Sequence, residues 1–192
     1  MIQRKYFFDS VRGSLFAGSL NQSQVDGLNA LLDYAESNLV DDRHLAYVLA
    51  TTFHETAQTM QPIAEYGKGK GKSYGNPAGP YGQCYYGRGY VQLTWYDNYV
   101  KQDKKLGLND ELVKNADLAL DPTIAMQVLF QGMNDGDFTG VGLPKYITCK
   151  NVETDTTDFY NARKIVNGLD CAQQIQGYAQ KFANAITHTQ EV

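Results

Sequence analysis

The sequence is divided by one stretch that is too rich in glycine to form a helix. Residues 66–83 contain six glycines and two prolines, interleaved with three lysines. Glycine loses more backbone freedom in a helix than any other residue, and proline cannot donate the helical hydrogen bond. We therefore expect an irregular loop here, with helical segments before and after it. Such a loop is typical of the rim of a cleft.

Three helices are predicted before this loop. Apolar residues recur with a helical period in residues 6–16, 25–35 and 45–60. Asn21 and Gln24 have the spacing of a capping box at the start of the second segment. Asp41 or Asp42 can cap the third, which we expect to reach about Met60.

After the loop, the sequence predicts a short extended segment followed by further helices. Residues 85–95 are β-like and punctuated by glycine, which favours a hairpin or an extended segment. Asp121-Pro122 is typical of a helix start, and residues 137–157 look irregular. The other predicted helices cover residues 96–106, 159–166 and a last segment capped by Asp170. Because no linker or repeat interrupts the chain, we expect a single mainly α domain over residues 1–192.

Composition narrows the possible partners and the compartment. The net charge of −4 provides no basic face for nucleic acid, and no apolar run reaches transmembrane length. We therefore expect no nucleic-acid partner, no membrane insertion and a monomer. Residues 1–16 carry four charges and do not resemble a signal peptide, and the three scattered cysteines favour a cytosolic product without disulfides.

Two familiar kinds of site can be set aside. His54-Glu55 begins like a helical zinc motif, but Gln58 stands where the second histidine belongs. Gly71-Lys72-Ser73 ends like a phosphate-binding loop, but Tyr66 occupies the place of the required glycine. We expect no metal and no cofactor. Composition alone does not exclude a serine or cysteine nucleophile, although no motif for one occurs.

Glu55 and Glu65 are the candidate catalytic carboxylates. Glu55 lies seven residues after Val48, at the border of the apolar stripe. Partial loss of hydration there disfavours the charged form, which suits a general acid. Glu65 follows the predicted helix end, so a loop can bring it to the other side of a glycosidic bond. Taken alone, spacing favours an ordinary solvent-exposed side chain for each glutamate.

Two motifs resemble those of the glycoside hydrolase family 19 chitinases and their phage-lysin relatives. They are His54-Glu55-Thr56 and Tyr86-Gly-Arg-Gly-Tyr-Val-Gln-Leu-Thr-Trp95. Residues 8–12 and 24–27 resemble the phage and prophage branch, and Ile165-Val-Asn-Gly168 resembles a later family element. The resemblance runs from about residue 8 to 185. It implies a lysozyme-like, mostly α fold with a cleft between two lobes, and inverting hydrolysis of a β-1,4 bond next to an N-acetylated sugar.

The resemblance also implies the roles of the two glutamates. By position, Glu55 corresponds to the general acid and Glu65 to the base that activates water. The sequence departs from the family in two places. Ala57-Gln58 replaces a common Gly-Gly, and Leu169 replaces the second glycine of an Asn-Gly-Gly element.

Further residues are implied to bind substrate or to support the site. They are His54, Tyr86, Arg88, Gln92, Thr94, Asn98, Arg163 and Asn167. Structural alternatives remain for some of them. Arg88 could form an ion pair within the fold, and Asn167 could be a left-handed helix stop. For Tyr86 and Trp95 the alternative is core packing, which we favour for Trp95.

The expected function is that of a peptidoglycan hydrolase, a muramidase-type phage or prophage endolysin that acts on glycan strands. Such a lysin is made in the cytoplasm of a bacterial host and acts on the wall after release to the periplasm. A chitinase that cleaves chitin oligosaccharides is the alternative with the same chemistry. A non-catalytic sugar-binding protein is the alternative of another class, against which the presence of both glutamates argues.

Overall fold

Helix α3 (Asp42–Glu55) is the most deeply buried helix of one lobe of the structure, a computed structural model that describes residues 1–150 and 154–187. All nine residues from Leu45 to Phe53 are buried, so the helix is enclosed on every side and not only along one stripe. Its N-cap is Asp41, whose carboxylate accepts a hydrogen bond from the Arg43 amide at 2.9 Å. The predicted helix start is therefore confirmed.

The end of α3 differs from the prediction. The helix stops at Glu55 instead of continuing to about Met60. Ala57 and Gln58 have φ of +49° and +67°, a left-handed conformation that a right-handed helix cannot contain. These two positions are the ones at which the family resemblance predicts Gly-Gly, and glycine adopts this conformation at the least cost. The turn leaves Glu55 at the open end of a rigid helix.

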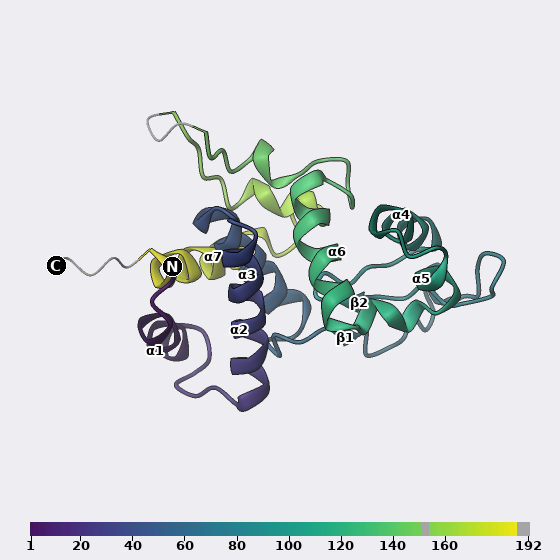
Figure 1. The fold of residues 1–192 in the computed structure, drawn as a ribbon, viewed down its shortest axis with the longest axis horizontal. Coiled ribbons are helices and arrows are strands. Elements are labelled where there is room, and N and C mark those ends of the chain that lie inside the picture. Colours follow the sequence, from purple (N-terminus) through teal and green to yellow (C-terminus); the bar gives the residue numbers. More distant parts are fainter. Residues whose placement is uncertain (151–153, 188–192) are drawn as a thin grey trace.

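Three further helices complete the first lobe (Figure 1). They are α1 (Arg4–Ser14), α2 (Gln22–Ser37) and α7 (Ala172–Ile186). Helices α2 and α7 pack against α3, and α1 packs against α7. The capping box of Asn21 and Gln24 is present at the start of α2, as predicted. The ring of Phe53 on α3 meets the edges of Tyr178 and Phe182 on α7, with centroid separations of 4.8 and 6.1 Å.

The second lobe contains the small sheet and the middle helices (Figure 1). Its elements are β1 (Ile63–Ala64), η1 (Ser73–Gly75), β2 (Arg88–Gly89), α4 (Tyr96–Leu106), α5 (Glu111–Lys114) and η2 (Ala116–Leu120). The two strands pair antiparallel, with Ile63 opposite Gly89. The predicted extended segment is thus present, and α4 covers the predicted residues 96–106 before the left-handed Gly107. The short helices α5 and η2 were not predicted.

Helix α6 (Pro122–Asp135) lies between the two lobes (Figure 1). It starts at the predicted Asp121 cap and ends at the left-handed Gly136. The Lys105 ammonium on α4 bonds the carboxylates of Asp135 and Asp137 at 2.7 and 2.6 Å, which ties the second lobe to the end of α6. The buried side chains of both lobes form one continuous hydrophobic cluster.

Two short 3-10 helices follow α6, where the sequence predicted an irregular stretch and then an α-helix. They are η3 (Leu143–Lys145) and η4 (Asn161–Ile165). The last helix, α7, is preceded by Cys171 with φ of +57°, not by an Asp170 side-chain cap. None of the helices in the described ranges is long and apolar enough to cross a bilayer.

Candidate active site

A hollow of about 440 Å³ lies between the lobes. This volume falls within the range of small-molecule sites in proteins. The end of α3 and the loops after α6 and η4 line one side, and the segments around η1, β2 and the start of α4 line the other. The lining residues are Glu55, Tyr74, Val91, Gln92, Leu93, Thr94, Trp95, Asn98, Phe138, Val166 and Asn167. Five residues predicted for the site, far apart in the sequence, therefore share one cavity.

Glu55 is held at the hollow by a buried arginine. Its Oε1 accepts a hydrogen bond from Arg163 Nη1 at 2.7 Å. The Arg163 side chain is only 3% exposed, and its Nε donates to the Asp170 carbonyl oxygen at 3.0 Å. The guanidinium thus fixes the direction of the Glu55 carboxyl group. Within the described residues Oε2 of Glu55 has no hydrogen-bond partner, so this oxygen is free to exchange a proton.

Glu65 follows β1 and is held from two sides. Its Oε1 accepts a hydrogen bond from the Tyr74 hydroxyl at 3.1 Å, and its Oε2 accepts one from the Gly87 amide at 3.3 Å. Glu65 is thus an ordered side chain, not a freely solvated one. It does not itself line the hollow, but Tyr74 does. Burial and the bond to Glu65 raise the pKa of the Tyr74 hydroxyl, which therefore stays protonated and continues to donate.

Gln92, Thr94 and Asn98 form a polar wall of the hollow. The Gln92 side-chain nitrogen donates to the carbonyl oxygens of Ile63 and Gly89 at 3.0 and 3.2 Å, which fixes the amide beside the small sheet. The Asn98 side-chain nitrogen donates to the Thr94 carbonyl oxygen at 2.9 Å. These bonds orient the amide side chains and leave both amide oxygens available for a ligand.

Gly87 explains part of the glycine pattern in the second motif. A Cβ at this position would lie 2.8 Å from Oε1 of Gln92, and the Gly87 amide is the group that donates to Glu65. Any larger residue would push Gln92 or shift this backbone segment. The glycine therefore allows the Gln92 side chain to lie against this backbone segment.

Trp95 lies in the hollow, and the prediction that it packs in the core was wrong. Its side chain is 49% exposed and lines the cavity. The Tyr74 ring meets it edge to face, with centroids 5.4 Å apart and an interplanar angle of 79°. Sequence reasoning missed Tyr74 entirely. The available signal was an aromatic residue within a glycine-rich loop directly after Glu65.

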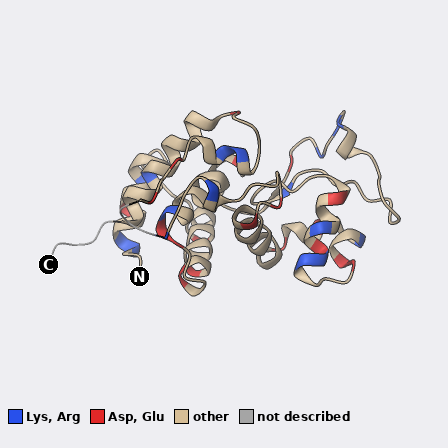
Figure 2. Cartoon of the chain, turned by 90° about the horizontal axis from the view of Figure 1, so that it is seen from above, with Lys and Arg blue, Asp and Glu red and all other residues tan. Residues whose placement is uncertain are grey.

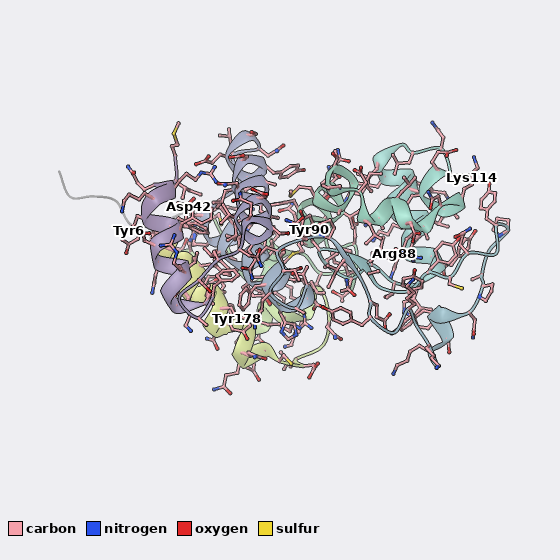
Figure 3. All side chains as sticks on the ribbon, turned by 90° about the horizontal axis from the view of Figure 1, so that it is seen from below. Tyr6, Asp42, Arg88, Tyr90, Lys114 and Tyr178 are labelled. Atoms are coloured by element: carbon pink, nitrogen blue, oxygen red, sulfur yellow. The ribbon has the colours of Figure 1, made fainter. Side chains whose placement is uncertain are left out.

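Arg88 has the structural role that the sequence left as an alternative. It is 4% exposed, lies inside the second lobe (Figure 3), and its Nε bonds Asp117 Oδ1 at 2.8 Å. Its guanidinium also stacks on the ring of Tyr86, 3.6 Å from the centroid. Neither Arg88 nor Tyr86 lines the hollow. Both residues support the backbone that carries Gln92.

Two further predicted residues differ in position. His54 precedes Glu55 on α3, is half-buried, and does not line the hollow. Asn167 does line it, and it has no left-handed conformation, so it is not the helix stop that the sequence allowed. Among the described residues no group of three histidine, cysteine, aspartate or glutamate side chains could hold a metal ion.

Comparison with known proteins shows that the chain is similar to chitinases. No protein-family model matches the chain. It is 27% identical to chitinase C from Streptomyces griseus HUT6037, over 96% of this chain and 90% of that one, with a TM-score of 0.53. The chain shares a chitinase fold. A glutamate-to-glutamine mutant of chitinase C gives a TM-score of 0.52 at 25% identity.

Plant endochitinases match part of this chitinase-like chain. An acidic endochitinase of Solanum chilense is 34% identical over 90 residues, which are 40% of this chain and 36% of that protein. An endochitinase of Arabidopsis thaliana is 37% identical over 98 residues, 48% of this chain and 33% of that protein. The chain thus spans about a third of the length of these curated relatives. Together the comparisons show a likeness to chitinases, in fold over most of the chain and in sequence over part of it.

Proposed function

We propose that the chain hydrolyses β-1,4 bonds next to N-acetylated amino sugars, with Glu55 as general acid and Glu65 as general base. The observation that carries this proposal is the hollow itself. Glu55 stands on one side of it, and on the other side Tyr74 bonds directly to Glu65. Glycoside hydrolysis needs one carboxyl group on each side of the scissile bond; here Glu55 lines the hollow and Glu65 lies behind Tyr74 on the other side.

The proposed reaction is a single displacement by water. Glu55 donates its proton to the glycosidic oxygen as the bond to the anomeric carbon breaks. Glu65 accepts a proton from a water molecule whose oxygen attacks that carbon from the opposite face, so the configuration inverts. Space for this water requires carboxyl groups roughly 6.5–9.5 Å apart. Gln92, Thr94 and Asn98 offer oxygens and a hydroxyl to orient the sugar, and Trp95 offers a ring face.

The substrate we propose is peptidoglycan. In this proposal the chain is a phage or prophage endolysin that reaches the wall after release from the host cytoplasm. Chitin is the second candidate, since the relatives with the same fold are named chitinases. Both polymers present β-1,4-linked N-acetylated sugars, so the same two glutamates serve either one.

Mass spectrometry of digests separates these possibilities. Purified peptidoglycan and chitin are incubated with the chain in parallel, and the new reducing ends are identified. We expect fragments of peptidoglycan that end in a reducing N-acetylmuramic acid. Fragments from chitin alone would make the protein a chitinase, and no fragments from either polymer would favour a non-catalytic sugar-binding protein.

A further inference from the structure

Three lysines lie on the loop between Glu65 and Tyr74. Lys68, Lys70 and Lys72 alternate with glycines, and all three are exposed. Within residues 1–150 and 154–187, their ammonium groups form no ion pair and no hydrogen bond. This differs from other lysines of the chain, such as Lys105, whose charge is neutralised by two carboxylates.

The loop holds these lysines in a defined arrangement beside the hollow. The amide of each lysine donates to the carbonyl oxygen three residues earlier, at 2.8–2.9 Å, which makes three successive turns. Gly69 has φ of +71°, and a Cβ there would lie 2.5 Å from the Cα of Gly75, so the two limbs of the loop are in contact. The bond from Tyr74 to Glu65 closes the loop at its base. The lysine side chains therefore belong to the same folded unit as the proposed base.

The charge around this loop is opposite to that of the whole chain. The net charge is −4, yet no aspartate or glutamate occurs between Glu65 and Asp97. Figure 2 shows the positive stretches of the loop at the end of the molecule opposite the two termini. A local cluster of unpaired cations at the edge of a cleft attracts an anionic ligand.

We propose that Lys68, Lys70 and Lys72 form a subsite for the carboxylates of the peptide stems of peptidoglycan. This inference rests on the proposed peptidoglycan substrate. Peptide stems carry free carboxylates beside the glycan strand, whereas chitin made of N-acetylglucosamine is uncharged. A glycan seated in the hollow places such groups next to its rim, where the three ammonium groups are available to bind them. The subsite thus selects the charged polymer over the neutral one.

Binding to insoluble sacculi tests the subsite separately from catalysis. The Glu55→Gln variant is used throughout, so that the polymer stays intact, and binding is measured by co-sedimentation at low and high salt. The lysine triple variant K68Q/K70Q/K72Q is compared with K5Q/K114Q/K181Q, which removes the same charge from α1, α5 and α7. Loss of three exposed charge contacts should weaken binding to intact sacculi about tenfold. The control variant should bind as the parent does.

Removing the ligand should have the same effect as removing the lysines. Sacculi whose stem carboxylates have been converted to amides should bind the parent and the loop variant equally weakly, and chitin should not distinguish them. Equal binding of both variants to intact sacculi, or undiminished parent binding to sacculi with amidated stems, would overturn the inference. So would lysine-dependent binding to anionic phospholipid vesicles without lysine-dependent binding to sacculi. Failure of the unmutated chain to cleave peptidoglycan, with the loop effect present, would refute the proposed function and leave the subsite standing.

Discussion

At the scale of single residues, the proposal depends on how Glu55 is supported. Its carboxyl group is bonded on one oxygen by a buried arginine and is free on the other within the described residues. Arg163 is fixed in turn by the Asp170 carbonyl oxygen, so the geometry does not depend on a mobile side chain. The Glu55 carboxyl group is thus held in place before a substrate binds, as is typical of a preorganised catalytic group.

Glu55→Gln should abolish hydrolysis and leave the fold intact. Glutamine keeps the shape of the side chain and can still accept a bond from Arg163, but it cannot donate the proton. We expect kcat to fall by about 10²–10⁴-fold or more. The measurement is reducing-sugar release, with circular dichroism as the control for folding. Activity within a few-fold of the unmutated enzyme, in a folded variant, would exclude Glu55 as the acid.

Trp95→Ala should weaken substrate binding without a large effect on stability. The side chain is half exposed in the hollow, so its removal costs little core packing but deletes a ring face for the sugar. We expect KM to rise about three- to tenfold, as for the loss of one aromatic contact. Tyr6→Ala on α1 is the matched control, since Tyr6 is 38% exposed and does not line the hollow. A drop in Tm for Trp95→Ala with unchanged KM would mean that Trp95 stabilises the fold and does not bind the sugar.

At the scale of elements, α3 positions the acid because both of its ends are fixed. Asp41 caps the start, and the left-handed turn at Ala57 and Gln58 stops the helix directly after Glu55. Burial raises the pKa of Asp41, but the hydrogen bonds from Arg43 outweigh this effect and lower it to about 2. The ionised cap is therefore favoured in the folded state.

Asp41→Ala should destabilise the protein at neutral pH by about 1–2 kcal/mol, the usual cost of losing an N-cap. The folded-state pKa lies below the ordinary value of 3.8, so this stability is present above about pH 4 and is lost as the pH falls toward 2. Denaturant unfolding is measured for both proteins at pH 7 and pH 2.5. The difference in the free energy of unfolding between variant and parent should be smaller at the lower pH. At pH 7 the stability of Asp41→Asn, which keeps a capping oxygen, should lie between that of the parent and that of Asp41→Ala. An equal difference at both pH values would contradict the ionised cap.

The helices with clear start and stop signals were predictable from the sequence, and the short ones were not. The capping box at Asn21, the Asp121-Pro122 start and the Gly107 stop all act locally, so the sequence shows them directly. The end of α3 depends on a strained turn between non-glycine residues, which local propensity does not predict. The helices α5 and η2 are too short for an apolar period to be visible.

The site could be predicted only in part, for a similar reason. The motif residues Glu55, Gln92, Thr94 and Asn98 meet at the hollow, as the family resemblance implied. Tertiary packing decides which side of a glycine-rich segment faces the cavity. The positions of Arg88 and Trp95 in the motif therefore could not show which of them is buried and which lines the cavity. Arg88 is buried against Tyr86 and Asp117, whereas Trp95 points into the hollow.

At the scale of the whole molecule, the two proposed catalytic groups belong to different lobes. Glu55 ends the central helix of the first lobe, and Glu65 follows β1 in the second. Their separation is therefore set by how the lobes pack, with α6 and the Lys105 network between them (Figure 1). The two-carboxylate mechanism makes a prediction about stereochemistry that depends on this separation.

The anomeric configuration of the first product tests the central claim most directly. A β-1,4-linked N-acetylglucosamine oligosaccharide or a soluble peptidoglycan fragment is hydrolysed in an NMR tube, and the anomeric proton signals are followed before mutarotation. Water activated by Glu65 attacks from the face opposite the leaving group, so the α-anomer should appear first and the β-anomer later. Initial release of the β-anomer would mean retention, which requires a nucleophile about 5–5.5 Å from the acid and would remove Glu65 from the role of base.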